Sequence, residues 1–375
     1  MARLQRWTIA VGAAGALALL PTVALADEPG SGRVSGARTI ELPRWPLASL
    51  ASAAPAQSLD QPKVQELYAA AKKEGQVIVW GTQRREVDWI PAAFGKVFPG
   101  IDVQFLGDND IAVKAIAEAR GGRHQVDVYQ SSLTGTLPVV QRDLMGGVDW
   151  SPFGIDKRNI AFDGKMALTS NIVYTVAYNN KLVKEADAPK SWADILDERY
   201  RGKGASSTFL LPRLVGGLGL AWGEDKALQF ARDIVAKMNL LLTRAPRESL
   251  LQSGERLYAF GEIDSLIRSV AAEGLPVSQV VPEPVVVGQF GVTIPRNAPH
   301  PSAARLLAGF LASAEGKAAR LQATSQADYG PTSSNELARK LHSGALKVVW
   351  DTPDNMAARE ALFGRAAAIL TGQAR

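Results

Sequence analysis

Hydrophobic positions along the first third of the chain alternate between helical and strand spacing. Apolar residues recur at helical intervals over 62–75, where Pro62 suits a first helical turn and Gly75 suits a C-cap. Strand-like runs and further helical patterns then follow in turn, at 76–80, 89–97, 101–106, 110–119 and 126–129. This βαβαβ order predicts a mostly parallel sheet with helices on its faces.

The same plan repeats after residue 166. Strand-like runs occur at 166–169, 172–178, 203–206, 240–243 and 257–260. Helical patterns occur between or after them, at 192–196, 227–238, 247–252 and 263–272. Two α/β units predict a two-lobed architecture. Ligands of such sheets bind outside the carboxyl ends of the strands, so we expect a site in a cleft between the lobes.

Residues 282–331 are interpreted as the return of the chain from the second lobe to the first. An apolar run at Val285–Val287 continues through two glycines into Val292–Ile294, and a Pro-rich turn at 297–301 precedes two helical patterns. The chain would cross between the lobes near 174–179 and again near 287–292. Both crossings are extended, which predicts a two-strand hinge.

The N-terminus predicts export. Arg3 and Arg6 precede an apolar segment at 8–20, and the small residues Ala24–Ala26 form a cleavage site. A membrane anchor is the alternative, but the apolar stretch is shorter than the roughly 20 residues that a span needs. The predicted organisation is a signal peptide at 1–26, an irregular leader at 27–60, the first part of lobe 1 at 61–175, lobe 2 at 176–288, and a return to lobe 1 with C-terminal helices at 289–375.

Composition narrows the class of protein. The chain has 375 residues, which after the signal peptide suffices for two domains of ordinary size. It has no Cys, so it has neither a disulfide nor a site for a lipid anchor, and we expect a free periplasmic monomer. The formal net charge of +5 is mild, and no basic-aromatic repeat indicates nucleic-acid binding.

Motifs for catalysis and cofactor binding are missing from the sequence. There is no G-x-S-x-G, no H-E-x-x-H and no G-x-x-x-x-G-K-[ST]. The three His residues, His124, His300 and His342, have no metal-like spacing. We therefore expect a binding protein without cofactor or bound metal rather than an enzyme.

Several short stretches resemble the solute-binding proteins of ABC importers, family 1, in its ferric-ion-type cluster. In chain order they are Lys73–Val79, Phe98–Val103, Val126–Val128, Ala177–Asn179, Ser191–Lys203, Arg296–Pro301, Phe310–Gly316 and Tyr329–Pro331. The resemblance implies a two-lobed, type II-like periplasmic-binding-protein fold. It also implies that the lobes close on a small solute and deliver it to an ABC permease in the inner membrane.

The chain departs from the ferric pattern at two places. Ferric members usually carry two adjacent tyrosines at the start of the helix that follows a "GE" strand end, whereas this chain reads Gly261–Ile267 without a Tyr. The loop Gly81–Arg84 also lacks the family's His. We therefore expect a small organic anion (phosphorylated, phosphonate or carboxylate) as the cargo. The alternatives are ferric iron held through a synergistic anion and, from another class, an exported hydrolase.

The first candidate ligand residues follow the strand at 76–80. Thr82, Gln83 and Arg84 could hold an anion through backbone N–H groups and a guanidinium. A solvated turn is the alternative for the same three residues.

Two hydroxyl-rich loops supply further candidates. Ser131 and Ser132 follow the strand of the first lobe at 126–129, and Ser206, Ser207 and Thr208 follow a strand of the second lobe. Each loop opens a helix, so its amides and hydroxyls are suited to solute oxygens. Simple N-capping is the alternative and is compatible with binding.

Four more candidates lie at the second-lobe helix start and at the crossings. Asp264 and Ser265 occupy the position of the ferric tyrosines, where Asp264 either pairs a cationic group of the solute or caps its helix. Tyr174 and Gln289 lie at the predicted crossings. Core packing is the alternative for Tyr174.

Overall fold

The computed structural model describes residues 59–81, 84–107 and 111–373, all within one compact unit. The predicted signal peptide at 1–26 and the leader as far as residue 58 lie outside the described residues. Within the described part, no helix is both long and apolar enough to cross a membrane.

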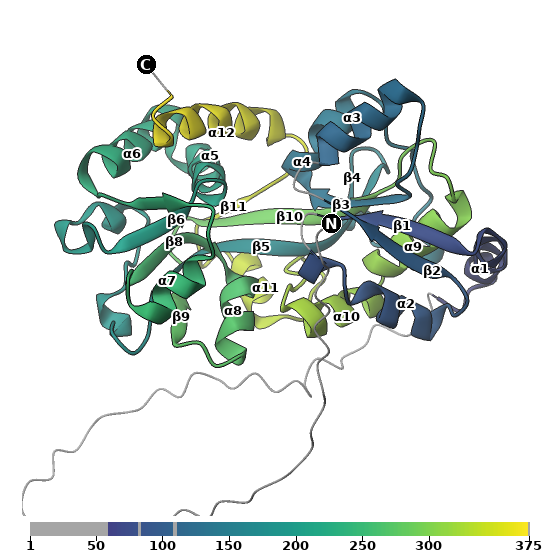
Figure 1. The fold of residues 1–375 in the computed structure, drawn as a ribbon, viewed down its shortest axis with the longest axis horizontal. Helices are drawn as coiled ribbons and strands as arrows, with labels where there is room; N and C mark the ends of the chain where they lie inside the picture. Colours follow the sequence, from purple (N-terminus) through teal and green to yellow (C-terminus); the bar gives the residue numbers. More distant parts are fainter. Residues whose placement is uncertain (1–58, 82–83, 108–110, 374–375) are drawn as a thin grey trace, which may run out of the picture. The chain divides into compact units, whose positions relative to one another are not determined.

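The first lobe is built on three parallel strands with helices on both faces (Figure 1). The strands lie in the order β2 (Asp102–Leu106), β1 (Gln76–Trp80) and β3 (Val128–Ser132). The helices of this lobe are α1 (Pro62–Glu74), α2 (Ile90–Val97), α3 (Ile111–Gly121), α4 (Leu133–Gln141), α9 (Pro301–Ala312) and α10 (Ala314–Thr324). Val77 and Val79 of β1 share a core with residues of α1, α2 and α9, while α3 and α4 pack around Tyr129 on the opposite face.

Local sequence features account for the ends of α1. Pro62 occupies the first turn, and Gly75 adopts the left-handed conformation at φ 75° as the C-cap. Both predictions are confirmed. Pro lacks the N–H that an initial helical residue leaves unpaired, and Gly has no Cβ to oppose positive φ.

The second lobe repeats the parallel arrangement. Strand β6 (Gly204–Ser207) pairs in parallel with β7 (Leu241–Thr243) and with β8 (Tyr258–Ile263). Its helices are α5 (Leu210–Trp222), α6 (Glu224–Lys237), α7 (Arg247–Ser253) and α8 (Asp264–Ala272). A Cβ at Gly217 of α5 would lie 2.5 Å from Val286 Cγ1, so this glycine allows α5 to pack closely against β10.

Two long strands connect the lobes. Strand β5 (Met166–Asn179) pairs antiparallel with β10 (Val285–Thr293) as far as Val173 and with β8 from Tyr174 onward. Its later residues also pair antiparallel with β9 (Val277–Val280). Strand β10 also runs antiparallel to β3. The α/β fold is confirmed. The strands β1, β2 and β3 of the first lobe pair in parallel, as do β6, β7 and β8 of the second, and each antiparallel strand pair of the described structure involves β5 or β10.

The two strands predicted at 166–169 and 172–178 are one continuous strand, β5. Polar Ser170 and Asn171 interrupt its apolar pattern, but both are buried and hydrogen-bonded to the returning segment. Asn171 Oδ1 accepts from the backbone N–H of Tyr329 at 2.7 Å. Tertiary hydrogen bonds therefore keep polar residues inside the sheet.

The C-terminal segment adds α11 (Glu336–His342), β11 (Val348–Trp350), which pairs in parallel with β10, and α12 (Met356–Leu370). Leu362, Ala366 and Leu370 of α12 belong to the core of the second lobe. In Figure 1 this helix, in yellow, lies beside α5 and α6. The predicted boundaries between the lobe segments, after residues 175 and 288, stay a prediction.

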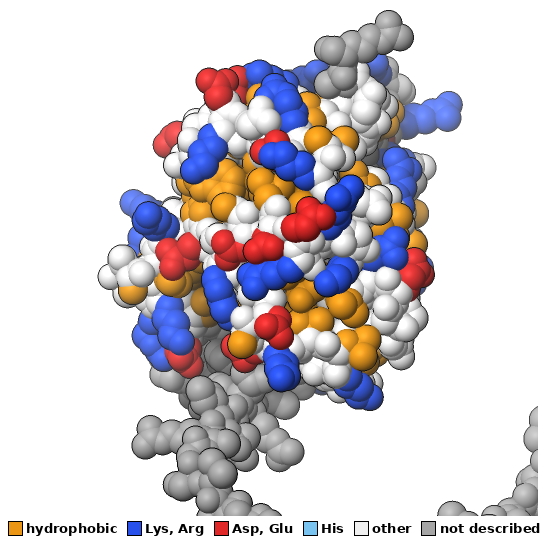
Figure 2. Space-filling model, turned by 90° about the vertical axis from the view of Figure 1, so that its left-hand side faces the viewer, with side chains coloured by type: hydrophobic (Ala, Val, Ile, Leu, Met, Phe, Trp, Pro, Cys, Tyr) orange, Lys and Arg blue, Asp and Glu red, His pale blue; other side chains and the backbone are white. Residues whose placement is uncertain are grey.

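The face shown in Figure 2 is the end of the molecule formed by the second lobe. Lys and Arg side chains lie among Asp and Glu side chains there, with hydrophobic patches between them. Charges of both signs are therefore interspersed on this face, which is typical of a solvated surface.

Candidate functional site

Two helix N-termini, one from each lobe, carry the hydroxyl-rich loops. Ser132 Oγ accepts a hydrogen bond from the Gly135 N–H at 3.1 Å and caps α4. Ser207 Oγ accepts from the N–H groups of Phe209 and Leu210, both at 3.1 Å, and so caps the start of α5. The capping alternative therefore describes what both serines do in this structure.

Arg213 joins these two helix starts across the lobes. Its Nη1 donates to Thr134 Oγ1 in the first turn of α4 at 2.5 Å. Its guanidinium carbon lies 4.3 Å from the ring centroid of Phe209 and 4.7 Å from that of Phe363 in α12. Its Nε is buried without a hydrogen-bond partner in the described part of the chain. A cation with an unused donor thus lies between two positive helix ends, an arrangement that favours an anion.

Of the other candidates that follow strands, three are buried and one is half-buried. Ser131 pairs with Gly291 in the sheet and is 4% exposed, Ser206 Oγ donates to the Phe260 carbonyl at 2.5 Å, and Ser265 is 3% exposed. Thr208 is half-buried beside the α5 start, and its N–H donates to the Thr243 carbonyl at 3.3 Å.

The first-strand loop is described only in part. Thr82 and Gln83 lie outside the described residues. Arg84 is exposed, pairs with Asp88 at 3.1 Å, and lies 5.4 Å from the ring centroid of Phe105. Such an exposed pair contributes little to stability, and it leaves the Arg84 side chain accessible.

Asp264 is fully engaged inside the protein. Oδ1 accepts from the Val173 N–H at 3.0 Å, and Oδ2 accepts from the Tyr329 hydroxyl at 2.7 Å and pairs with Arg268 at 3.0 Å. Burial first, and then the neighbouring Asp264 carboxylate, raise the pKa of the Tyr329 hydroxyl. Asp264 is 1% exposed, so its carboxylate fastens the start of α8 to the connecting strand β5 and to the returning segment.

The two candidates on the connecting strands also make internal contacts. Tyr174 is 1% exposed and belongs to the second-lobe core. Gln289 Nε2 donates to the Asp351 carbonyl. The carboxylate of Asp351 forms a buried ion pair with Arg359, whose pKa is lowered by burial.

Another buried arginine, not anticipated from the sequence, lies against strand β3 of the first lobe. Arg320 of α10 is 1% exposed, donates to Oε1 of Gln130 in β3, and lies 3.4 Å from Gln326 Oε1. The burial follows from packing, because Gly316, four residues before Arg320 on the same helix face, packs against α9.

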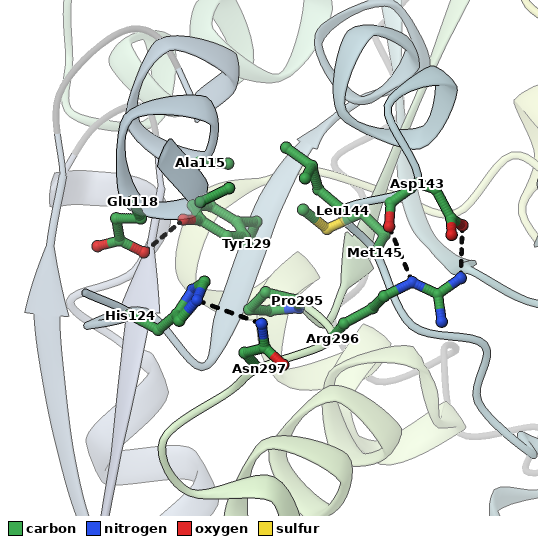
Figure 3. Close-up of a pocket in the computed structure, with 11 residues that line it drawn as sticks. Ala115, Glu118, His124, Tyr129, Asp143, Leu144, Met145, Pro295, Arg296 and Asn297 are labelled. Carbon is green, nitrogen blue, oxygen red and sulfur yellow. Dashed lines mark hydrogen bonds and ion pairs between the residues drawn. The ribbon is translucent and has the colours of Figure 1, made fainter. Parts of the chain in front are cut away.

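One cavity of about 240 Å³ lies away from these loops (Figure 3). It is lined by residues of α3, the start of β3, the end of α4 and the turn after β10. Its polar groups already pair with one another: Tyr129 with Glu118, Asn297 with His124, and Arg296 with Asp143. The amino-terminal end of β3 borders this cavity, so it is not where an α/β sheet binds its ligand.

Across the described residues, no three side chains from His, Asp and Glu come together in a group that could hold a metal ion. Each His bonds elsewhere: His300 to Asp127, His124 to Asn297, and His342 to the Tyr329 carbonyl.

Comparison with protein families gives one match. The model of the bacterial extracellular solute-binding proteins matches residues 82–318. A comparison with curated proteins finds no match.

Several solved structures have the same fold, and the alignment with this chain covers nearly the whole of each of them. Iron-bound HitA from Pseudomonas aeruginosa is 17% identical, with a TM-score of 0.66 over 78% of this chain and 99% of that chain. The substrate-binding protein of an ABC transporter from Agrobacterium tumefaciens is 16% identical, with a TM-score of 0.67 over 80% and 96%. AgtB from A. tumefaciens R10, in complex with agropinic acid, is 14% identical, with a TM-score of 0.62 over 79% and 99%. At these identities the likeness concerns the fold, and it confirms the predicted two-lobed architecture.

Proposed function

The chain belongs to the family of bacterial extracellular solute-binding proteins, and from this premise we propose that it captures a small organic anion between its two lobes. The solute would be phosphorylated, a phosphonate or a carboxylate. Proteins of this family bind small solutes and work with a membrane permease. We propose that this one acts as a monomer in the periplasm and hands its cargo to an ABC permease.

The contact between Arg213 and Thr134 carries the proposal. It brings the N-termini of α4 and α5 together with a guanidinium whose Nε has no partner in the described residues. Ser132, Ser207 and Thr208 lie at the same helix starts and offer amides and hydroxyls to solute oxygens. An anion there gains both the helix dipoles and a charge-assisted hydrogen bond, and it favours the closed arrangement of the lobes.

Among the other predicted residues, those of the first-strand loop take part in the proposal and Asp264 does not. Thr82, Gln83 and Arg84 would contribute from the first-strand loop. The partners of Asp264 favour a structural role over pairing with a cationic group of the solute.

Ferric iron bound through a synergistic anion is the second candidate. It is favoured by the likeness to iron-bound HitA. The chain offers Asp264 and Ser265 where ferric members carry tyrosines, and Asp264 is already bonded to Arg268 and Tyr329. An exported hydrolase, the remaining alternative, would need a base beside a hydroxyl nucleophile. The hydrogen bonds of the three His side chains go to Asp127, Gln76, Asn297 and the Tyr329 carbonyl instead.

Native mass spectrometry of protein purified without refolding tests the proposal. We expect a co-purified solute whose mass and fragments identify an acid, and a rise in the thermal midpoint when that acid is added back. Arg213→Gln should weaken its binding, while Arg158→Gln, which removes only an exposed pair with Asp156, should not. Tight Fe(III) binding accompanied by colour would favour the second candidate, and a neutral or cationic solute would contradict the anion proposal.

A further inference from the structure

Arg320 is a buried cation that has no carboxylate hydrogen-bonded to it among the described residues. The side chain lies 5.3 Å from the ring centroid of Trp89, and the only hydrogen-bond acceptors described for it are the amide oxygens of Gln130 and Gln326. Burial lowers the pKa of Arg320 to about 10 despite the opposing influence of Glu86. The guanidinium therefore stays charged at neutral pH without a carboxylate bonded to it in the described part of the chain.

Two other largely buried arginines, Arg359 and Arg247, each have a carboxylate partner. Arg359 pairs with the Asp351 carboxylate, and Arg247 donates twice to Glu262, at 2.7 and 3.0 Å. A buried charge without a counter-ion is strongly destabilising, so proteins rarely keep one that has no use. Arg320 departs from the pairing that this chain gives to Arg359 and Arg247.

Two donors remain unused at this place. Neither Arg320 Nε nor Gln130 Nε2 has a hydrogen-bond partner among the described residues, although both residues are at most 3% exposed. Buried polar atoms are nearly always hydrogen-bonded in native proteins. The Nε–H of Arg320 and the N–H₂ of Gln130, each without an acceptor among the described residues, together have the donor chemistry of an oxyanion site.

The position of the cluster links it to the solute cleft. Gln130 is two residues before Ser132, and an idealised Cβ on Gly81 lies 3.9 Å from Gln130 Nε2. Gly81 directly follows β1 and β3 ends two residues after Gln130, so Gln130 Nε2, to whose amide oxygen Arg320 donates, lies near the carboxyl ends of these two strands. Ligands of α/β lobes bind at these ends.

We propose that Arg320 and Gln130 bind the oxyanion group of the solute and select for its negative charge. This inference rests on the proposed function. The guanidinium and amide N–H groups donate to a phosphoryl or carboxylate oxygen, which supplies the acceptors that both side chains lack. Arg320, rather than the exposed Arg84, then provides the charge selectivity of the first lobe.

Isothermal titration with inorganic phosphate, malonate and the neutral probe glycerol tests this assignment, together with titration of the solute identified by native mass spectrometry. Wild type should bind at least one oxyanion. Arg320→Gln should weaken that binding about 10- to 100-fold, because a hydrogen bond to a charged group is lost. Arg158→Gln, which removes only an exposed pair with Asp156, is the matched control and should keep the wild-type affinity within about twofold. Arg320→Lys, which retains the charge without the planar fork, should keep part of the affinity.

Thermal unfolding separates binding from a purely structural role. Without ligand, Arg320→Gln should keep or raise the thermal midpoint, because it removes an uncompensated buried charge. Gln130→Glu should raise the midpoint and abolish oxyanion binding, because its carboxylate takes the place of the anion. The second variant also decides the question if Arg320→Gln does not fold.

Three outcomes would overturn the inference. If Arg320→Gln binds the oxyanion or the identified acid as wild type does, Arg320 is not the selector, although the proposed function stands. If Gln130→Glu still binds the oxyanion, the two donors do not form its site. If wild type binds no oxyanion and co-purifies with no acid, the proposed function is wrong, and this inference fails with it.

Discussion

At the scale of single residues, the difference between a structural and a binding carboxylate lies in how many partners it already has. Asp264 stands where ferric relatives carry ligands, yet its oxygens bond to Val173, Tyr329 and Arg268. Its position in the sequence indicates a site, whereas its hydrogen bonds indicate a connection between α8 and the strands that link the lobes.

Asp264→Asn should destabilise the protein by about 3 kcal/mol, because it removes the charge that Arg268 and Tyr329 face. This value is at the low end for a broken buried pair, since the Arg268 side chain is 37% exposed. Tyr329→Phe, which removes only the hydroxyl, should cost about 1.5 kcal/mol. Urea unfolding measures both. Equal losses for the two variants would contradict the central role of the carboxylate.

A second residue-scale prediction concerns acid. Burial tends to raise the pKa of Asp194, but hydrogen bonds from the Ser191 hydroxyl, the Ser191 N–H and the Lys190 N–H outweigh it and hold this pKa below its usual value. A depressed carboxyl pKa stabilises the folded state above the unfolded pKa of about 4, and this stabilisation is lost as the pH falls through the folded pKa. Asp194→Asn should therefore flatten the decline in the free energy of unfolding between roughly pH 5 and pH 2. An unchanged slope would show that other carboxyls cause the decline.

The sequence supports some of these assignments and not others. The helix-capping roles of Ser132 and Ser207 could be predicted because each serine lies at the end of a strand and opens a helix. Arg320 could not be found in this way, since an arginine in a polar helix is ordinarily solvated and only the packing of α10 shows that it is buried. The hydrogen bond of Arg213 could not be predicted either, because its acceptor, Thr134, lies 79 residues earlier in the chain.

At the scale of elements, apolar periodicity predicts the existence of strands better than their limits. The strand predicted at 126–129 is β3, Val128–Ser132, because Asp127 turns its carboxylate to the Ile78 and His300 N–H groups before the strand begins. Strand β5 is longer than predicted because Asn171 bonds to a segment more than 150 residues later. Neither partner is visible in a local window of sequence.

The start of α10 gives an element-scale prediction. A Cβ at Gly316 would lie 1.9 Å from the Phe310 carbonyl oxygen, so Gly316→Ala must displace α10 from α9. We expect a loss of about 1–3 kcal/mol by urea unfolding. The control is Gly364→Ala in α12, where a Cβ meets nothing within 4 Å and helix propensity should add about 0.5–1 kcal/mol. Similar effects at the two positions would contradict the packing argument.

At the scale of the whole molecule, the two-lobed fold could be predicted because two α/β patterns and a returning segment occur in order along the chain. The attachment of α12 to the second lobe could not be predicted, since its apolar residues fit any helix face. Only the shared core of Leu362 and Ala366 with α5 and α6 assigns it.

Loss of the hydrogen bond between Thr134 and Arg213 should change how often the two lobes are closed. Thr134→Val removes the acceptor while keeping the side-chain shape, so the closed arrangement should be less populated and solute binding about tenfold weaker. Small-angle scattering of the ligand-free variant should give a larger radius of gyration than wild type. Thr169→Val, whose hydroxyl bonds only the nearby Phe290 carbonyl in the described structure, is the control. Identical scattering from Thr134→Val and wild type would show that this bond does not hold the lobes together.

The position of α12 also decides when a growing chain can finish folding. The first-lobe cluster around Val77 and Val79 takes its last buried residue from α9, at Ala312, whereas the core of the second lobe includes Leu370. A chain delivered N-terminus first can therefore complete this cluster earlier, but α5 and α6 keep an apolar face uncovered until nearly the last residues have arrived. The second lobe cannot complete its core before α12 is present. A chain that stops before Met356 leaves the apolar face of α5 and α6 exposed and prone to aggregation.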